Sequence, residues 1–295
     1  MDKVKKKSLA LLLILIFAFV ALAGCASKQA AVQPVPTPAN PNVILATTTS
    51  TQDSGLLDVL IPEFQKQTGY VVKTVAVGSG AALTMGEKGE ADVLLVHSPA
   101  AEKALVEKGF GTNYLLVMHN DFIIIGPASD PAGIKGSATA IDALKKIAAK
   151  GSPFISRGDK SGTDTLEKGL WKTAGIPQVV GASYQETGQG MGATLTVAEQ
   201  KSAYTITDRA TYLAQKKNLT LVILVEGDKS LLNIYHVMTV NPEKWPKVNA
   251  AGGKAFDDFM VAPATQQIIA KFGVDQYGQQ LFYPDAGKNE ADLGK

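Results

Sequence analysis

Short apolar runs alternate with longer stretches of helical periodicity along most of the chain. Between Leu56 and Phe64 the apolar residues recur on one helical face, and Gly69 provides a stop signal. The pair Ser98-Pro99 predicts another helix start. The apolar runs predict strands at 43–46, 71–77, 91–96, 122–125, 154–155, 203–206, 221–225 and 232–240. Repeated strand–helix units of this kind predict an α/β fold with mainly parallel sheets and helices on both faces.

The order of these elements predicts two α/β lobes joined by two crossing segments, near residues 119–126 and 227–236. The run at 232–240 is long enough to return the chain from the second lobe to the first. We therefore expect lobe 1 to contain residues 43–122 and 232–295, and lobe 2 to contain residues 123–231. The sequence shows no fixed-period repeat, which argues against a solenoid.

Residues 1–24 have the organisation of a signal peptide. A lysine-rich segment precedes an apolar run from Leu9 to Ala23, which is shorter than the ~20 residues that a membrane-spanning helix needs. The four residues ending at Cys25, Leu-Ala-Gly-Cys, resemble the bacterial lipoprotein signal, in which the cysteine carries lipid. The alternative is an ordinary signal peptide with an incidental cysteine. We expect lipidation of Cys25, a proline-rich linker in residues 25–42, and an extracytoplasmic body anchored to the cell membrane.

The composition and the charge narrow the classes of function. Of the 295 residues, 45% are hydrophobic and 19% are charged, which is an ordinary globular balance. The formal net charge is +2; the first 24 residues, with four lysines and one aspartate, carry +3, so the rest of the chain carries −1. A nearly neutral body without a basic stripe argues against a nucleic-acid partner. The histidines, at positions 97, 119 and 236, show no metal-ligand spacing, so we expect them to be structural and expect no metal or cofactor.

Two loops rich in hydroxyls and glycine follow predicted strands of lobe 1. Residues 47–51 read Thr-Thr-Thr-Ser-Thr at the end of the first strand, where open α/β sheets bind ligands. Residues 77–82 place a serine between two glycines, which allow the backbone to approach a ligand closely. A helix is predicted to begin at this segment, and its first backbone N–H groups could face an anion. The alternatives are a capping turn and a simple tight turn. The candidate binding residues in these loops are Thr48, Thr49, Ser50 and Ser79.

Two further loops precede predicted helices of lobe 2. Residues 156–164 combine Arg157, a planar donor that keeps its charge, with Ser161 and Thr163 at the start of a helix. The alternative is a surface Arg–Asp pair beside an ordinary helix cap. In residues 188–194, the backbone N–H groups of Met191 and Gly192 are candidate donors, although the Met191 side chain fits simple packing equally well.

Hydroxyls, backbone amides and one arginine suit an anion that has no proton to donate. A buried anion must be matched by donors, because each unpaired buried group costs roughly 1–3 kcal/mol. Phosphate carries a proton near neutral pH, so a phosphate site is expected to contain a carboxylate that accepts this proton in a hydrogen bond. Asp159 and Asp164 are the candidates for such an acceptor. Sulfate, molybdate and tungstate carry none. A secreted hydrolase that uses Ser79 or Ser161 is a further alternative and would need a base within reach. A lipoprotein with a purely structural role at the cell surface is another alternative.

The chain from about Ile44 to Ala286 resembles the tungstate-binding receptors of tungstate ABC importers, in the periplasmic-binding-protein type II superfamily. The motifs that carry the resemblance are Ala-Thr-Thr-Thr-Ser at 46–50, Ser-Arg-Gly-Asp with Ser-Gly-Thr at 156–163, Ala-Tyr-Thr-Ile-Thr-Asp-Arg at 203–209, and Leu-Phe-Tyr-Pro at 281–284.

This resemblance implies a two-lobed receptor, not an enzyme, that closes over tungstate or molybdate and delivers it to an ABC permease. It implies a monomer, and it implies that donors to the anion come from both lobes. The residues it implicates are Thr48, Ser50 and Ser79 in lobe 1 and Arg157 and Thr163 in lobe 2.

Overall fold

The computed structural model describes residues 37–176 and 183–293. The predicted signal peptide, Cys25 and most of the predicted linker lie outside these residues, so they stay predictions. Within the described ranges, no helix combines the length and the apolar character needed to span a membrane. The first strand begins at Asn42, close to where the apolar pattern predicts it.

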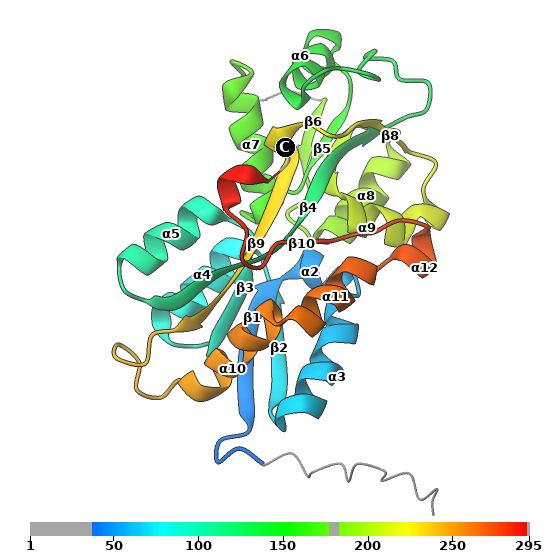
Figure 1. The fold of residues 1–295 in the computed structure, drawn as a ribbon. Helices are drawn as coiled ribbons and strands as arrows, with labels where there is room; N and C mark the ends of the chain where they lie inside the picture. The colour runs from blue at the N-terminus through cyan, green and yellow to red at the C-terminus, as the bar shows by residue number, and fades with distance from the viewer. Residues whose placement is uncertain (1–36, 177–182, 294–295) are drawn as a thin grey trace, which may run out of the picture. The chain divides into compact units, whose positions relative to one another are not determined.

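The strands of lobe 1 form one sheet in the order β10-β4-β9-β3-β1-β2 (Figure 1). Its members are β1 (Asn42–Thr48), β2 (Val71–Val77), β3 (Val93–Val96), the first part of β4 (Gly111–Gly126), β9 (Leu232–Val240) and β10 (Tyr283–Pro284). Strand β1 pairs in parallel with both β2 and β3, whereas β9 is antiparallel to β3 and to β4. The carboxyl ends of β1, β2 and β3 therefore meet at one edge of the sheet.

The strands of lobe 2 gather around the second part of β4. There β4 pairs antiparallel with β7 (Thr205–Asp208) and β8 (Val222–Val225). Strand β5 (Phe154–Ser156) pairs in parallel with β6 (Tyr184–Glu186), and an isolated parallel bridge joins Phe154 to Tyr204, the residue before β7. Strand β4 thus runs through both lobes as one continuous strand of 16 residues.

The predicted α/β class is confirmed, but the sheets are mixed and not mainly parallel. Parallel pairing holds for β1 with its two neighbours and for β5 with β6. The antiparallel pairs involve β4 and β9, which lie side by side and run in opposite directions between residues 111–121 and 232–240. Apolar runs indicate where strands lie but not their direction, so the sequence pattern could not reveal this.

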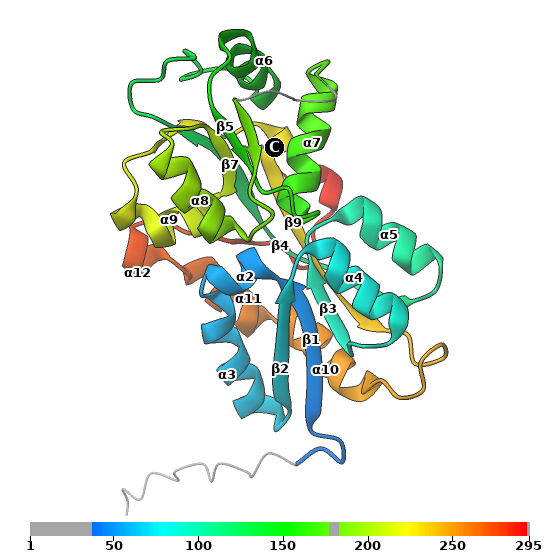
Figure 2. The same cartoon turned by 180° about the vertical axis from the view of Figure 1, so that it is seen from behind.

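Helices pack on both faces of the lobe 1 sheet, as the views from the two sides show (Figures 1 and 2). On one face, Phe64 of α3 (Leu56–Thr68) meets Phe256 and Phe259 of α10 (Ala250–Val261), with ring centroids 5.1 and 5.3 Å apart. The remaining helices of this lobe are α2 (Thr49–Asp53), α4 (Ser79–Lys88), α5 (Pro99–Glu107), α11 (Pro263–Lys271) and α12 (Val274–Tyr277).

Lobe 2 has its own apolar core, in which Phe154 of β5 packs edge-on against Trp171 with ring centroids 5.2 Å apart. Trp171 belongs to α7 (Gly162–Thr173). The other helices of this lobe are α6 (Ala140–Lys150), α8 (Met191–Gln200) and α9 (Arg209–Gln215). Four helices, α2, α4, α7 and α8, begin in the four hydroxyl- and glycine-rich loops that the sequence singles out. The fold therefore supplies four helix N-termini, whose first backbone N–H groups have no partner within the helix.

The core of lobe 2 also contains a buried carboxyl group, Glu167, which is 2% exposed. Its Oε1 accepts hydrogen bonds from Trp171 Nε1 at 3.1 Å and from Tyr184 Oη at 2.8 Å. Burial raises the pKa of Glu167 to about 7. The folded state therefore holds this proton more tightly than the unfolded state does.

We expect Glu167→Gln to flatten the dependence of stability on pH. Because the folded pKa is raised from 4.5 to about 7, the group favours the folded state fully below pH 4.5, and this contribution is lost as the pH rises through 7. The loss is on the order of 3 kcal/mol. Urea unfolding at pH 5 and pH 8 measures it, with the exposed Glu107→Gln as control. Equal pH dependence in the wild type and Glu167→Gln would contradict this.

Candidate anion-binding site

The hydroxyl-rich segment after β1 forms the start of α2. Thr48 caps this helix: its Oγ1 accepts a hydrogen bond from Thr51 N at 3.2 Å and lies 2.6 Å from Thr51 Oγ1. Ser50 Oγ lies 3.2 Å from Thr48 Oγ1. Thr48 and Ser50 are each 2% exposed. The fold thus gathers these hydroxyls into one buried cluster at the carboxyl end of β1.

Arg157 connects this cluster to lobe 2. The residue follows β5 directly and is 2% exposed. Its Nη2 donates to Thr49 Oγ1 in lobe 1 at 3.1 Å and to Asp159 Oδ2 at 2.5 Å. Its Nη1 lies 3.5 Å from Thr163 Oγ1, at the start of α7. The Nε atom is buried and has no hydrogen-bond partner among the described residues. A permanent positive charge is therefore held between the lobes with donor capacity left over.

The loop that holds Arg157 depends on a glycine. Gly158 has a φ of 62°, and a Cβ at this position would lie 2.5 Å from Glu186 Cβ. The carboxylate of Asp164 accepts hydrogen bonds from Gly158 N at 3.2 Å and from Lys160 N at 3.1 Å. A side chain at 158 would therefore displace the loop and, with it, the guanidinium.

Ser79 and Gly162 bring the starts of α4 and α7 together. Ser79 is 1% exposed, and its Oγ has no hydrogen-bond partner among the described residues. A Cβ built on Gly162 would lie 3.1 Å from Ser79 Oγ. A Cβ on Gly78 would lie 3.4 Å from Ser161 Cα. The two lobes are thus in contact at this point, and a free hydroxyl donor is buried at the contact.

His97 is a site residue that the sequence did not single out. It follows β3 and is 5% exposed, and its Nε2 lies 3.0 Å from Thr48 Oγ1 and 3.3 Å from Ser50 Oγ. A Cβ on Gly162 would lie 2.8 Å from the His97 ring. Burial, and then the charge of Arg157, lower the pKa of His97 to about 3. The position at the end of a strand, just before the Ser98-Pro99 helix start, was the available signal for it.

The side chains of the other candidate residues cap a helix or pack within lobe 2. Ser161 Oγ caps α7 by accepting from Asp164 N at 3.2 Å. The Met191 side chain is fully buried in the lobe 2 core, so its backbone N–H is what remains for a ligand. Gly192 packs against Gln215, where a Cβ would lie 2.5 Å from the side-chain amide nitrogen.

The carboxylates near Arg157 already have protein donors. Asp159 accepts from Arg157 and from Ser161 N, the latter at 3.1 Å. Asp164 accepts from the backbone of the loop and pairs with Lys168 at 3.0 Å.

Asp208, at the end of β7, caps α9 by accepting from Thr211 N at 2.8 Å. Burial raises the pKa of Asp208 to about 6, against the lowering effect of the Thr211 hydrogen bonds and the Arg157 charge. Asp208 was also missed from the sequence, although it follows a predicted strand.

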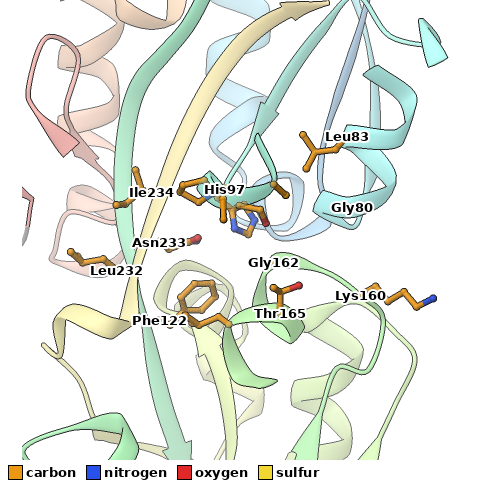
Figure 3. Close-up of a pocket in the computed structure, with 15 residues that line it drawn as sticks. Gly80, Leu83, His97, Phe122, Lys160, Gly162, Thr165, Leu232, Asn233 and Ile234 are labelled. Carbon is orange, nitrogen blue, oxygen red and sulfur yellow. The ribbon is translucent and has the colours of Figure 1, made fainter. Parts of the chain in front are cut away.

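A cavity of about 320 Å³ adjoins the site between the lobes (Figure 3). Residues Leu83, Phe122 and Ile234 give it a largely apolar lining, and His97 and Gly162 form part of its wall. The hydroxyls of Thr48, Ser50 and Ser79 and the Arg157 guanidinium do not line it. The buried donors are therefore the better candidate for an anion site than this cavity, because an anion requires donors that apolar walls lack.

The similarity of this chain to known proteins agrees with the fold described above. A family model described as "PBP superfamily domain" matches residues 35–264. This match defines the class of protein, and it agrees with the mixed two-lobed α/β fold. The curated tungstate-binding protein TupA of Peptoclostridium acidaminophilum is 50% identical over 270 residues, which cover 90% of this chain and 94% of the relative.

Two solved structures are also similar. The tungstate ABC transporter structure from Geobacter sulfurreducens is 49% identical, with a TM-score of 0.72, and the match covers 78% of this chain and 98% of that one. The tungstate-binding protein TupA from Desulfovibrio alaskensis is 50% identical, with a TM-score of 0.70, and the match covers 83% and 99%. The chain belongs to the family of these tungstate-binding proteins, within the PBP superfamily.

Proposed function

We propose that this protein binds tungstate between its two lobes and delivers it to the permease of an ABC importer. The observation that carries the proposal is the buried cluster of donors from both lobes around Arg157. Ser79 Oγ and Arg157 Nε are buried donors without partners among the described residues. Such groups are costly unless a ligand accepts from them. The names of the relatives, tungstate-binding proteins and a tungstate ABC transporter, support the choice of anion.

The proposed ligand donors are Thr48, Ser50 and Ser79 from lobe 1 and Arg157 and Thr163 from lobe 2, with Thr49, Ser161 and the N–H groups of Met191 and Gly192 in support. All four helix starts add partial positive charge near the same place. Enclosure by the lobes removes water, which strengthens each electrostatic contact by lowering the local dielectric. We propose that the closed form is what the permease recognises, and that the protein acts as a monomer anchored through Cys25 outside the cytoplasm.

A proton-free anion fits this donor set better than phosphate does. Asp159 and Asp164, the acceptors that would favour phosphate, are already engaged by Arg157, the loop backbone and Lys168. Molybdate has the same charge and shape as tungstate, so we include it as a second ligand.

A hydrolytic function has less support. Ser79 Oγ has no basic partner among the described residues, and Ser161 Oγ is used as a helix cap. Ser50 Oγ does lie 3.3 Å from His97 Nε2. However, a histidine whose pKa is lowered to about 3 is a weak general base at neutral pH.

Thermal unfolding of residues 26–295 with four sodium salts tests the proposal. We expect tungstate and molybdate to raise the unfolding temperature strongly, sulfate less, and phosphate least. A ligand at a thousandfold excess over its Kd stabilises the native state by about 4 kcal/mol. Displacement of tungstate by equimolar phosphate would favour the phosphate receptor instead, and no shift with any of the salts would contradict anion binding.

A further inference from the structure

Helix α9 packs against the apolar cores of both lobes. Figures 1 and 2 show it beside α8, on the side of lobe 2 that faces lobe 1. Ala210 of α9 is fully buried in the core of lobe 1, whereas Tyr212 is buried in the core of lobe 2. Leu213 packs against both cores. Among the described residues of lobe 2, Ala210 and Leu213 are the ones that join the core of lobe 1. The orientation of α9 therefore depends on both lobes at once.

Arg209, the first residue of α9, contacts both segments in which the chain crosses between the lobes. Its Nε donates to Asp121 Oδ1 at 2.8 Å and its Nη2 donates to Asp121 Oδ2 at 2.6 Å, so the guanidinium holds this carboxylate through two bonds. Nη2 also donates to Glu226 Oε2 at 2.6 Å. Asp121 belongs to the first crossing segment, and Glu226 directly precedes the second. Arg209 thus ties both crossings to the start of one helix.

Asp121 occupies the step at which β4 changes its pairing partner. Up to Asp121, β4 pairs with β9, and Asp121 lies opposite Leu232, the first residue of β9. From Phe122 onward it pairs with β7, and Phe122 lies opposite Asp208. The sheets of the two lobes therefore meet between residues 121 and 122. A change in the angle between the lobes bends β4 near this step, because the two ends of the strand belong to different sheets.

The contacts of Arg209 differ in how far water screens them. The side chains of Arg209 and Asp121 are 14% and 20% exposed, whereas that of Glu226 is 55% exposed. A two-bond pair that is largely shielded from water is stronger and more directional than an exposed pair. We therefore expect the bonds to Asp121 to be the main part of this clamp, and Glu226→Gln to change tungstate affinity less than about threefold.

Helix α9 also contacts two of the helices that begin in the hydroxyl- and glycine-rich loops. It packs against α2 of lobe 1 and against α8 of lobe 2. Asp208, the residue before Arg209, is 1% exposed and caps α9 by accepting from Thr211 N. The start of α9 is thus fixed on one side by Asp208 and on the other by the crossings. Its position sets how α2 and α8 face each other across the proposed site.

We propose that Arg209 is a positioning residue for anion binding, an inference that rests on the function proposed above. By holding both crossings against α9, Arg209 keeps the lobes in the arrangement in which donors from each lobe reach the same anion. Thr48 of lobe 1 and Arg157 of lobe 2 must both lie within hydrogen-bond distance of one ligand. Without the clamp the lobes adopt other angles, and the apparent affinity falls with the fraction of molecules in the competent arrangement.

Two substitutions that change the charge in opposite directions separate this role from electrostatic attraction. Arg209→Gln removes a positive charge and Asp121→Asn removes a negative charge, yet each weakens the clamp. We expect each to lower the affinity for sodium tungstate about tenfold, measured by isothermal titration calorimetry of residues 26–295. Attraction of the anion by charge alone predicts a loss for Arg209→Gln and a gain for Asp121→Asn. Unchanged or increased affinity in Asp121→Asn would overturn the proposal, and this variant decides alone if Arg209→Gln does not fold.

The exposed pair of Lys254 and Asp258 on α10 provides matched controls. Lys254→Gln and Asp258→Asn make the same charge changes away from the crossings, and we expect both to bind like the wild type. Unfolding temperatures without anion distinguish a purely structural role. A pair that only stabilises the fold lowers the unfolding temperature when it is broken and leaves the affinity unchanged, and this result would also overturn the proposal while leaving the proposed function intact. If the wild type binds no tungstate, the proposed function fails and the inference fails with it.

Discussion

Replacing Arg157 by alanine is expected to weaken tungstate binding by at least a thousandfold while the protein still folds. The guanidinium is 2% exposed and contacts Thr49 in lobe 1 and Thr163 in lobe 2. Losing one partner of a buried charged interaction commonly costs 2–5 kcal/mol or more, and Arg157 supplies the positive charge of the proposed site. Isothermal titration calorimetry measures the affinity, and circular dichroism verifies the fold.

Two further variants separate the effect of the guanidinium's shape from the effect of its charge. Arg157→Lys keeps the charge but lacks the planar set of donors, so we expect it to recover only a small part of the affinity. Lys172→Ala removes an exposed positive charge from the same lobe and is expected to bind like the wild type. Retention of wild-type affinity in Arg157→Ala would refute the assignment of this residue.

Gly162→Ala is expected to reduce tungstate affinity by ten- to a hundredfold while the protein still folds. The three atoms that a Cβ at this position would meet first all belong to lobe 1: two in the His97 ring at 2.8 Å and Ser79 Oγ at 3.1 Å. The added methyl group therefore obstructs the contact between the lobes and not the packing within lobe 2. Overpacking of this kind costs roughly 1–3 kcal/mol.

The same helix provides the control. Gly169 lies in the middle of α7, and a Cβ there has no neighbour within 4 Å. Gly169→Ala is expected to stabilise the protein by about 0.5–1 kcal/mol through helix propensity alone and to leave the affinity unchanged. If Gly162→Ala binds tungstate as tightly as Gly169→Ala does, the contact between Gly162 and the His97 ring is not part of the bound state.

Much of the fold could be predicted because the local signals are strong. The apolar runs locate most of the described strands but miss β6, β10 and the first part of β4, and the hydroxyl- and glycine-rich loops coincide with the starts of α2, α4, α7 and α8. Strand direction was not predictable, because β4 and β9 owe their antiparallel pairing to long-range topology, and an apolar run is the same in either direction.

The residues of the site differ in how well the sequence reveals them. The threonine-rich run stands out because five consecutive hydroxyl residues are poor helix formers, and Arg157 stands out because it brings a permanent charge and a planar set of donors to a loop before a helix. His97 lacks a local signature, and Asp208 appears only within the motif at 203–209, with no role assigned to it. Their surroundings become clear only in space: His97 meets Thr48 and Ser50, and Asp208 is near Arg157. Met191 shows the opposite case, since its loop suggested a ligand contact while its side chain packs in the core. Chain segments distant in sequence create these environments, so a local pattern cannot report them.

A crystal structure of residues 26–295 grown with sodium tungstate tests the central claim most directly, because the anomalous scattering of tungsten locates the anion without reference to any assumed site. We predict a single strong peak enclosed by both lobes, within hydrogen-bond distance of the Arg157 guanidinium and of the hydroxyls of Thr48, Ser50, Ser79 and Thr163. A peak elsewhere, for example in the apolar cavity beside Phe122, or a peak bound by one lobe alone, would contradict the account.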